Sequence, residues 1–146
     1  VAELARGQGL LVSRRSQWAA GPLPADVWIG DSLGEMALYY GMADVALLGG
    51  SFEPLGGQNL IEAAACGCPV VMGPHTFNFG EAAQLAQEAG AALRVGTLEE
   101  GVRVALELAT DSDRRQAGVA AASAFAAAHR GAADKTAEAV LALMSS

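Results

Sequence analysis

Short apolar runs alternate along the chain with segments in which apolar residues recur at helical spacing. Within each run the apolar character is continuous, which is typical of strands that are covered on both faces. The runs are residues 10–13, 27–30, 45–49, 69–72 and 91–95. Such strands, alternating with helices, predict an α/β fold: a Rossmann-like three-layer domain with a mostly parallel sheet.

Capping signals mark where several of the helices begin. Ser32-Leu33-Gly34-Glu35 has the capping-box pattern and predicts a helix from Glu35 to Tyr40. Thr97-Leu98-Glu99-Glu100 has the same pattern and predicts a helix to about Thr110. Further helices are predicted at residues 1–7 (the tail of a helix), 59–66, 81–88 and from 111 onward, with a break near Gly131. Because no strand pattern follows, we expect two or three helices to close the domain.

The composition fits one domain and excludes several classes of partner. A chain of 146 residues with 52% hydrophobic residues predicts a single domain over residues 1–146. The net charge of −7 argues against nonspecific binding to nucleic acid or to an anionic membrane, since both require a basic face. No apolar run is long enough to span a bilayer, and no signal peptide is visible. Since the chain starts abruptly in a helix tail without an initiator Met, we expect a fragment of a longer protein.

The two cysteines predict neither a disulfide nor a metal site. Cys66 and Cys68 are separated by one residue, which is too short for a comfortable disulfide. Two ligands do not make a zinc site. We interpret them as small buried residues at a turn between a helix and a strand.

The segment from Gly49 to Glu62 carries the strongest chemical signal. A predicted buried strand ends at Gly49-Gly50, a short loop with Ser51 follows, and Gly56-Gly57 precede a helix that begins near Asn59. Glycines there allow backbone angles closed to other residues and let a ligand lie against the main chain. Unpaired N–H groups and the positive dipole end at a helix start bind phosphate without a lysine. The segment lies at the carboxyl end of a strand, where open α/β sheets bind ligands.

Two glutamates allow both a binding and a capping interpretation. Glu62, three residues after Asn59, can accept hydrogen bonds from both hydroxyls of a ribose, and it also fits the N3 position of an ordinary helix cap. The glycine pairs beside the loop favour ligand binding for Glu62. Glu35 either completes its capping box or, at the same edge of the sheet, helps to hold a nucleobase. The residues alone leave both interpretations of Glu35 open.

The other candidates are weaker. His75 follows a predicted strand and either touches a ligand or is solvated, while Asn78 has the position of a cap for the next helix. Arg14 and Arg15 either neutralise an anionic sugar or are solvated at an exposed edge. The sequence contains no Ser-His-Asp or Cys-His set, no metal-ligand cluster and no dinucleotide-binding G-x-G-x-x-G. A complete catalytic apparatus is therefore not visible.

Several stretches of the chain are distinctive: residues 31–35, 43–46, 49–51, 56–62 and 69–79. In this order, from about Leu10 to Val95, the chain closely resembles the C-terminal domain of bacterial 3-deoxy-D-manno-octulosonic acid (Kdo) transferases. The glycine pairs followed by a glutamate helix are common to many glycosyltransferases of the GT-B fold, whereas the stretch from Met72 to Phe79 is much more particular.

The resemblance implies the donor-binding, C-terminal half of a two-domain GT-B enzyme. Such enzymes transfer Kdo from CMP-Kdo to a lipid A precursor at the cytoplasmic face of the inner membrane, with no cofactor. It implies that the membrane contact, the acceptor site and the catalytic base belong to an N-terminal domain, so that no catalytic residue is expected here. The implied nucleotide and donor contacts are Gly34, Glu35, Met36, Ser51, Gly56, Gly57, Gln58, Asn59, Leu60, Ile61 and Glu62, with His75 as a further candidate.

One position departs from the family pattern, which commonly has histidine where this chain has Gln58. A glutamine amide can still donate a hydrogen bond to phosphate but cannot become cationic, which puts donor affinity at mildly acid pH in doubt. Two alternatives remain open: another nucleotide-sugar enzyme of the same fold, such as a UDP-sugar transferase or epimerase, and a non-catalytic nucleotide-binding module.

Overall fold

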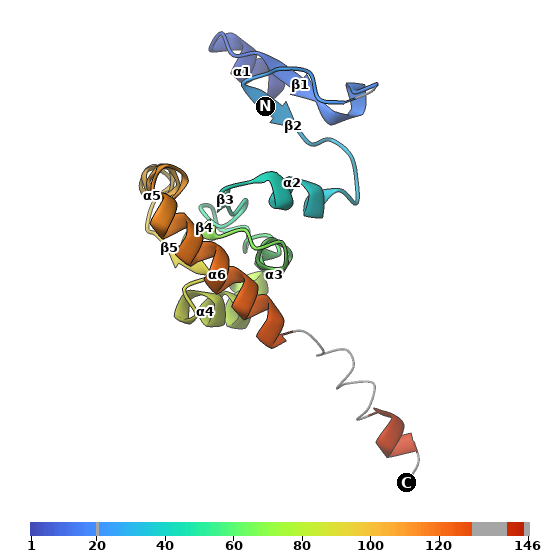
Figure 1. Ribbon diagram of the computed structural model, residues 1–146, viewed down its shortest axis with the longest axis vertical. Helices are drawn as coiled ribbons and strands as arrows, with labels where there is room; N and C mark the ends of the chain where they lie inside the picture. Colours follow the sequence, from blue (N-terminus) through green and yellow to red (C-terminus); the bar gives the residue numbers. More distant parts are fainter. Residues whose placement is uncertain (20, 130–139, 145–146) are drawn as a thin grey trace. The chain divides into compact units, whose positions relative to one another are not determined.

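The computed structural model describes residues 1–19, 21–129 and 140–144, and the chain divides into two compact units, Val1–Tyr39 and Tyr40–Ser146. All five predicted strands are present, and every strand pair among the described residues is parallel (Figure 1). The predicted α/β class is confirmed. The strands nevertheless form two hydrogen-bonded sheets, one in each unit, where the pattern predicted one.

The first unit contains a short helix and a pair of strands. Its elements are α1 (Ala2–Gly7), β1 (Val12–Arg14), the 3-10 helix η1 (Arg15–Gln17) and β2 (Val27–Ile29). The rings of Trp18 and Trp28 pack edge to face at 5.8 Å between centroids, and Nε1 of Trp18 donates to Oγ of Ser13 at 2.7 Å. These contacts tie the segment after β1 to the two strands. Helix α2 (Met36–Met42) follows and includes the boundary between the units.

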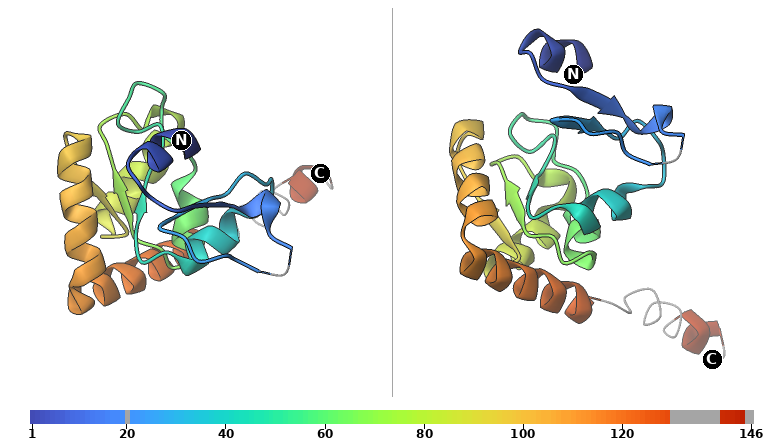
Figure 2. Two further views of the ribbon diagram at one scale, coloured as in Figure 1. Left: turned by 90° about the horizontal axis from the view of Figure 1, so that it is seen from above. Right: turned by 45° about the horizontal axis from the view of Figure 1, so that its top comes forward.

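The second unit is a three-stranded parallel sheet between helices (Figure 2). Its elements are β3 (Ala46–Leu47), α3 (Leu60–Ala65), β4 (Val70–Met72), the 3-10 helix η2 (Phe77–Phe79), α4 (Gly80–Glu88), β5 (Ala92–Arg94), α5 (Leu98–Thr110) and α6 (Ser112–His129). The strand order is β3-β4-β5. The core on one face comes from α3, α4 and α6, and the core on the other comes from α5.

The central strand explains why the apolar runs are continuous. Val70 and Met72 belong to the cluster with α3, α4 and α6, whereas Val71 between them belongs to the cluster with α5. All three side chains are almost completely buried. Because each side chain of this size contributes about 1.5–3 kcal/mol when buried, both faces of β4 must be apolar.

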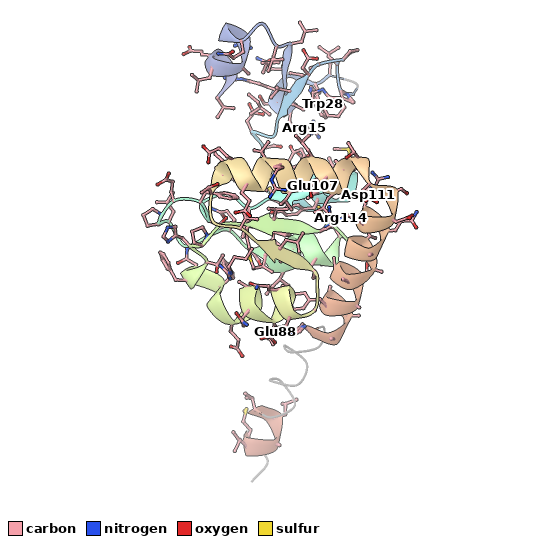
Figure 3. The ribbon with its side chains drawn as sticks, turned by 90° about the vertical axis from the view of Figure 1, so that its left-hand side faces the viewer. Arg15, Trp28, Glu88, Glu107, Asp111 and Arg114 are labelled. Atoms are coloured by element: carbon pink, nitrogen blue, oxygen red, sulfur yellow. The ribbon has the colours of Figure 1, made fainter. Side chains whose placement is uncertain are left out.

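The capping signal at Thr97 is confirmed. Oγ1 of Thr97 accepts from the Glu100 N–H at 3.2 Å, and Oε2 of Glu100 accepts from the Gly96 N–H at 2.9 Å. Asp111 begins α6 in the same way, since its Oδ1 accepts from the Arg114 N–H at 3.1 Å. Figure 3 shows Asp111 beside Arg114 and Glu107, where an ion pair of 2.8 Å joins Arg114 of α6 to Glu107 of α5.

The remaining predicted helices are present within about two residues of their expected bounds, and the predicted break near Gly131 lies outside the described residues. Over the part of the chain that the structure describes, no helix combines the length and apolar character needed to cross a bilayer. The same residues contain no cluster of three or more His, Cys, Asp or Glu side chains suited to a metal ion.

Candidate functional site

Two loops meet at the carboxyl edge of the sheet in the second unit. The glycine loop, residues 49–59, joins β3 to α3, and the His75 loop, residues 73–78, follows the neighbouring strand β4. The His75 N–H donates to the Ser51 carbonyl at 2.9 Å, and the Asn78 N–H donates to the Gly56 carbonyl at 3.1 Å. The predicted segment thus lies where parallel sheets bind ligands.

The glycine loop is closed by its own main chain. The Gly57 N–H donates to the Gly50 carbonyl at 3.0 Å, and the Gln58 N–H donates to the Gly49 carbonyl at 3.1 Å. Gly50, Gly56 and Gly57 have φ angles of +71°, +88° and +76°, which L side chains rarely adopt. The N–H groups of Gly57 and Gln58 therefore already have acceptors within the loop. The N–H groups of Asn59 and Leu60 have no acceptor among the residues described.

Glu62 is held by the residue that caps α3. Asn59 caps α3, since its Oδ1 accepts from the Ile61 N–H at 3.1 Å. Its Nδ2 donates to Oε1 of Glu62 at 3.0 Å, which fixes the carboxylate on the exposed side of the first turn. Within the described chain, Oε2 of Glu62 accepts no hydrogen bond and so is available to a ligand hydroxyl. The negative charge of Glu62 also raises the pKa of Tyr40, after the larger effect of partial burial.

The structure gives Ser51 a different role from the predicted donor contact. Its side chain is fully buried: Oγ donates to the Leu48 carbonyl at 2.6 Å and accepts from the Gly73 N–H at 2.8 Å. The hydroxyl therefore ties the ends of β3 and β4 together and cannot reach a ligand. Leu60 is likewise buried in the core, so only its main chain can face the site, whereas the Ile61 side chain is partly exposed.

Two residues at the site were assigned wrongly or missed by sequence reasoning. Asn78 does not cap α4, because its side-chain amide donates to the carbonyls of Leu55 and Gly57. Arg94 at the end of β5 donates to the carbonyls of Gly73 and Pro74 at 3.1 and 3.4 Å, and to Oγ1 of Thr76 at 3.0 Å. No local pattern marks these contacts.

His75 lies in the loop that Arg94 braces. Its main chain is fixed by the bond to Ser51, and its side chain is half-buried. A role for the imidazole in donor binding remains a prediction.

Glu35 is the centre of a polar cluster in the first unit. Its Oε1 accepts from Nη2 of Arg15 at 2.7 Å, and its Oε2 accepts from the hydroxyls of Ser32 and Tyr39. The Ser32 hydrogen bond, followed by the Arg15 contact, lowers the pKa of Glu35. The Ser32–Glu35 contact joins two side chains, unlike the side chain to main chain bonds of a capping box, and α2 begins one residue later, at Met36. Arg15, which could have been solvated, is thus engaged with Glu35.

Gly34 and Met36 flank this cluster. Gly34 has a φ of +80° with open space where a Cβ would lie, and the Met36 side chain is 45% exposed. A hollow of about 380 Å³ in the same unit is lined by Arg15, Trp18 and Leu38, among others. The guanidinium of Arg15 lies 5.2 Å from the centroid of the Trp18 ring.

A second hollow, also of about 380 Å³, lies at the other end of the strands of the second unit. It is mostly apolar and includes Pro69, Ala91 and Leu108 in its lining. Since Pro69 and Ala91 precede β4 and β5, this hollow is at the amino edge of the sheet, away from the glycine loop.

No protein-family model matches the chain. Among curated proteins, it is 53% identical over 133 residues to the 3-deoxy-D-manno-octulosonic acid transferase of Bordetella pertussis, and this covers 90% of the chain and 31% of the relative. It is 36% identical over 112 residues to the enzyme of the same name from Haemophilus influenzae, covering 77% of the chain and 26% of that relative. The chain therefore spans about a third or less of the length of these relatives.

A solved structure, the C-terminal CMP-Kdo binding domain of WaaA from Acinetobacter baumannii, has the same fold. It matches with a TM-score of 0.76 and 29% identity, over 85% of this chain and 65% of that one. The relatives and this structure agree with the resemblance seen in the sequence and do not favour the alternatives. The chain therefore belongs to the 3-deoxy-D-manno-octulosonic acid transferase family and corresponds to its C-terminal, GT-B half.

Proposed function

We propose that the chain is the donor-binding domain of an enzyme that transfers Kdo from CMP-Kdo to a lipid A precursor. What supports this most is the likeness, over 85% of the chain, to a domain that is described as binding CMP-Kdo. The Kdo transferase relatives support a glycosyltransferase activity for a longer protein that contains this chain. We infer that residues 1–146 act as one nucleotide-sugar-binding domain within it.

The chemistry of the glycine loop suits the ribose and phosphate of a nucleotide. The carboxylate of Glu62 is exposed, anchored by Asn59 and able to accept from two adjacent ribose hydroxyls. The N–H groups of Asn59 and Leu60, at the start of α3, suit a phosphate oxygen. Ile61 adds partly exposed apolar surface beside them. Gln58 is exposed and can donate through its amide, and His75 is a further candidate contact.

We propose that this domain holds the leaving group, while a residue outside this chain activates the acceptor. A carboxylate outside this chain removes a proton from an acceptor hydroxyl, which attacks the anomeric carbon as CMP leaves with inversion. Fixed N–H dipoles at the glycine loop stabilise the departing phosphate. We therefore expect the isolated chain to be inactive. The resemblance to bacterial Kdo transferases implies that the whole enzyme acts at the cytoplasmic face of the inner membrane.

Calorimetric titration with CMP, in competition with UMP, tests the proposal. Glu62→Gln keeps the shape of the side chain but weakens its hydrogen bonds to ribose. We expect CMP affinity to fall about tenfold, since hydrogen bonds to charged groups are worth about 1.5–3 kcal/mol. The matched control is Glu81→Gln, which removes an exposed acidic group from the first turn of α4. Lower thermal stability with unchanged affinity would leave Glu62 only its capping role, and a clear preference for UMP would contradict the assignment of the donor.

A further inference from the structure

Asn78, a residue of the His75 loop, donates hydrogen bonds to three consecutive carbonyls of the glycine loop. The side-chain Nδ2 of Asn78 donates to the Leu55 carbonyl at 3.1 Å and to the Gly57 carbonyl at 3.4 Å. The main-chain N–H of Asn78 donates to the carbonyl of the intervening Gly56 at 3.1 Å. The same side chain packs so closely against Gly56 that a Cβ there would overlap it.

These bonds determine which main-chain groups the loop presents to a ligand. Gly56 and Gly57 have φ angles of +88° and +76°. Because glycine lacks a Cβ, the peptide units beside these two residues can rotate with little steric resistance. A carbonyl that turned toward a phosphate would repel it, whereas an N–H group attracts it. By holding the carbonyls of residues 55 to 57 together, Asn78 keeps all three away from a bound anion.

We propose that Asn78 is a positioning residue of the nucleotide-sugar site: it withdraws three loop carbonyls so that the glycine loop accepts the donor phosphate. This inference rests on the proposed function. Asn78 acts through the loop and does not itself contact the donor. The side-chain bonds span more than twenty residues of sequence, so the loop that follows β4 sets the electrostatics of the loop that follows β3.

Comparing CMP with cytidine separates this role from a purely structural one. The two ligands share base and ribose and differ only in the phosphate, so a displaced carbonyl penalises CMP alone. Binding is measured by calorimetric titration of the full-length protein. For Asn78→Ala we expect about a tenfold loss of CMP affinity, with cytidine affinity changed less than twofold, because the two side-chain hydrogen bonds that hold the carbonyls of Leu55 and Gly57 are lost.

Asn78→Asp keeps the volume that packs against Gly56 but replaces the donating amide with a carboxylate, so that its loss of CMP affinity should be larger. Gln84→Ala is the control, since it removes an exposed amide of α4 that donates to Glu88. Equal losses for CMP and cytidine, or CMP affinity that stays at the wild-type level in Asn78→Asp, overturn the inference. If the wild-type protein binds neither ligand, the proposed function itself fails.

Discussion

Replacing Ser51 by alanine separates the structural role that we assign to its hydroxyl from the donor contact that the sequence predicted. The substitution removes the bond from Oγ to the Leu48 carbonyl and the acceptor of the Gly73 N–H. Each bond contributes about 1 kcal/mol net, and a buried N–H left without an acceptor costs about 1–3 kcal/mol. We therefore expect Ser51→Ala to lower the free energy of unfolding by about 2–4 kcal/mol.

Urea denaturation measures this loss. With a slope of about 2 kcal/mol per molar urea, the midpoint should fall by about 1–2 M. Far-UV circular dichroism follows α3 to α6 in the second unit, whereas tryptophan fluorescence reports the first unit, because Trp18 and Trp28 both lie there. The dichroism transition should move to lower urea concentration, and CMP affinity of the folded protein should stay within about twofold of wild type.

Ser112→Ala is the matched control. Its exposed hydroxyl accepts a long hydrogen bond of 3.5 Å from Gln116, and its loss should change stability by about 0.5 kcal/mol or less. The reasoning is refuted if Ser51→Ala leaves the midpoint unchanged and weakens CMP binding. That result would mean that the hydroxyl contacts the donor, as the sequence suggested.

Two further predictions concern titratable groups. Burial raises the pKa of the Cys68 thiol to about 11, so that only about one thiol in a thousand is ionised at pH 8. In a Cys66→Ala variant, iodoacetamide should therefore label Cys68 only after unfolding. Rapid labelling of the folded protein, detected by mass spectrometry, would contradict the burial of Cys68. The Ser32 and Arg15 contacts hold the pKa of Glu35 below its usual range, so the stability that Glu35 contributes is present above about pH 5 and is lost as the pH falls through its folded pKa. Melting curves followed by tryptophan fluorescence should therefore drop less steeply with acidification in Glu35→Gln than in wild type, and parallel curves for the two proteins would disprove the assignment.

Elements governed by neighbours in sequence were predictable. The five strands follow from the apolar runs, and both faces of β4 are covered by helices, as the continuous pattern predicts. The start of α5 follows from Thr97 and Glu100, which bond to groups only three or four residues away. The glycine loop and the cap at Asn59 were also visible, since Asn59 bonds to Ile61 and Glu62 beside it. Backbone preferences and capping act within one or two turns, so the sequence is enough to locate them.

The tertiary structure decided which of the candidate groups remain available. Whether the N–H groups of Gly57 and Gln58 are unpaired depends on the carbonyls of Gly50 and Gly49, which the closure of the loop brings to them. The same holds for Ser51, whose partner Gly73 lies 22 residues further along the chain. The type of a residue determines which hydrogen bonds its polar groups can make. The closure of the glycine loop and the packing of β3 against β4 determine that these bonds are made within the protein and are closed to a ligand.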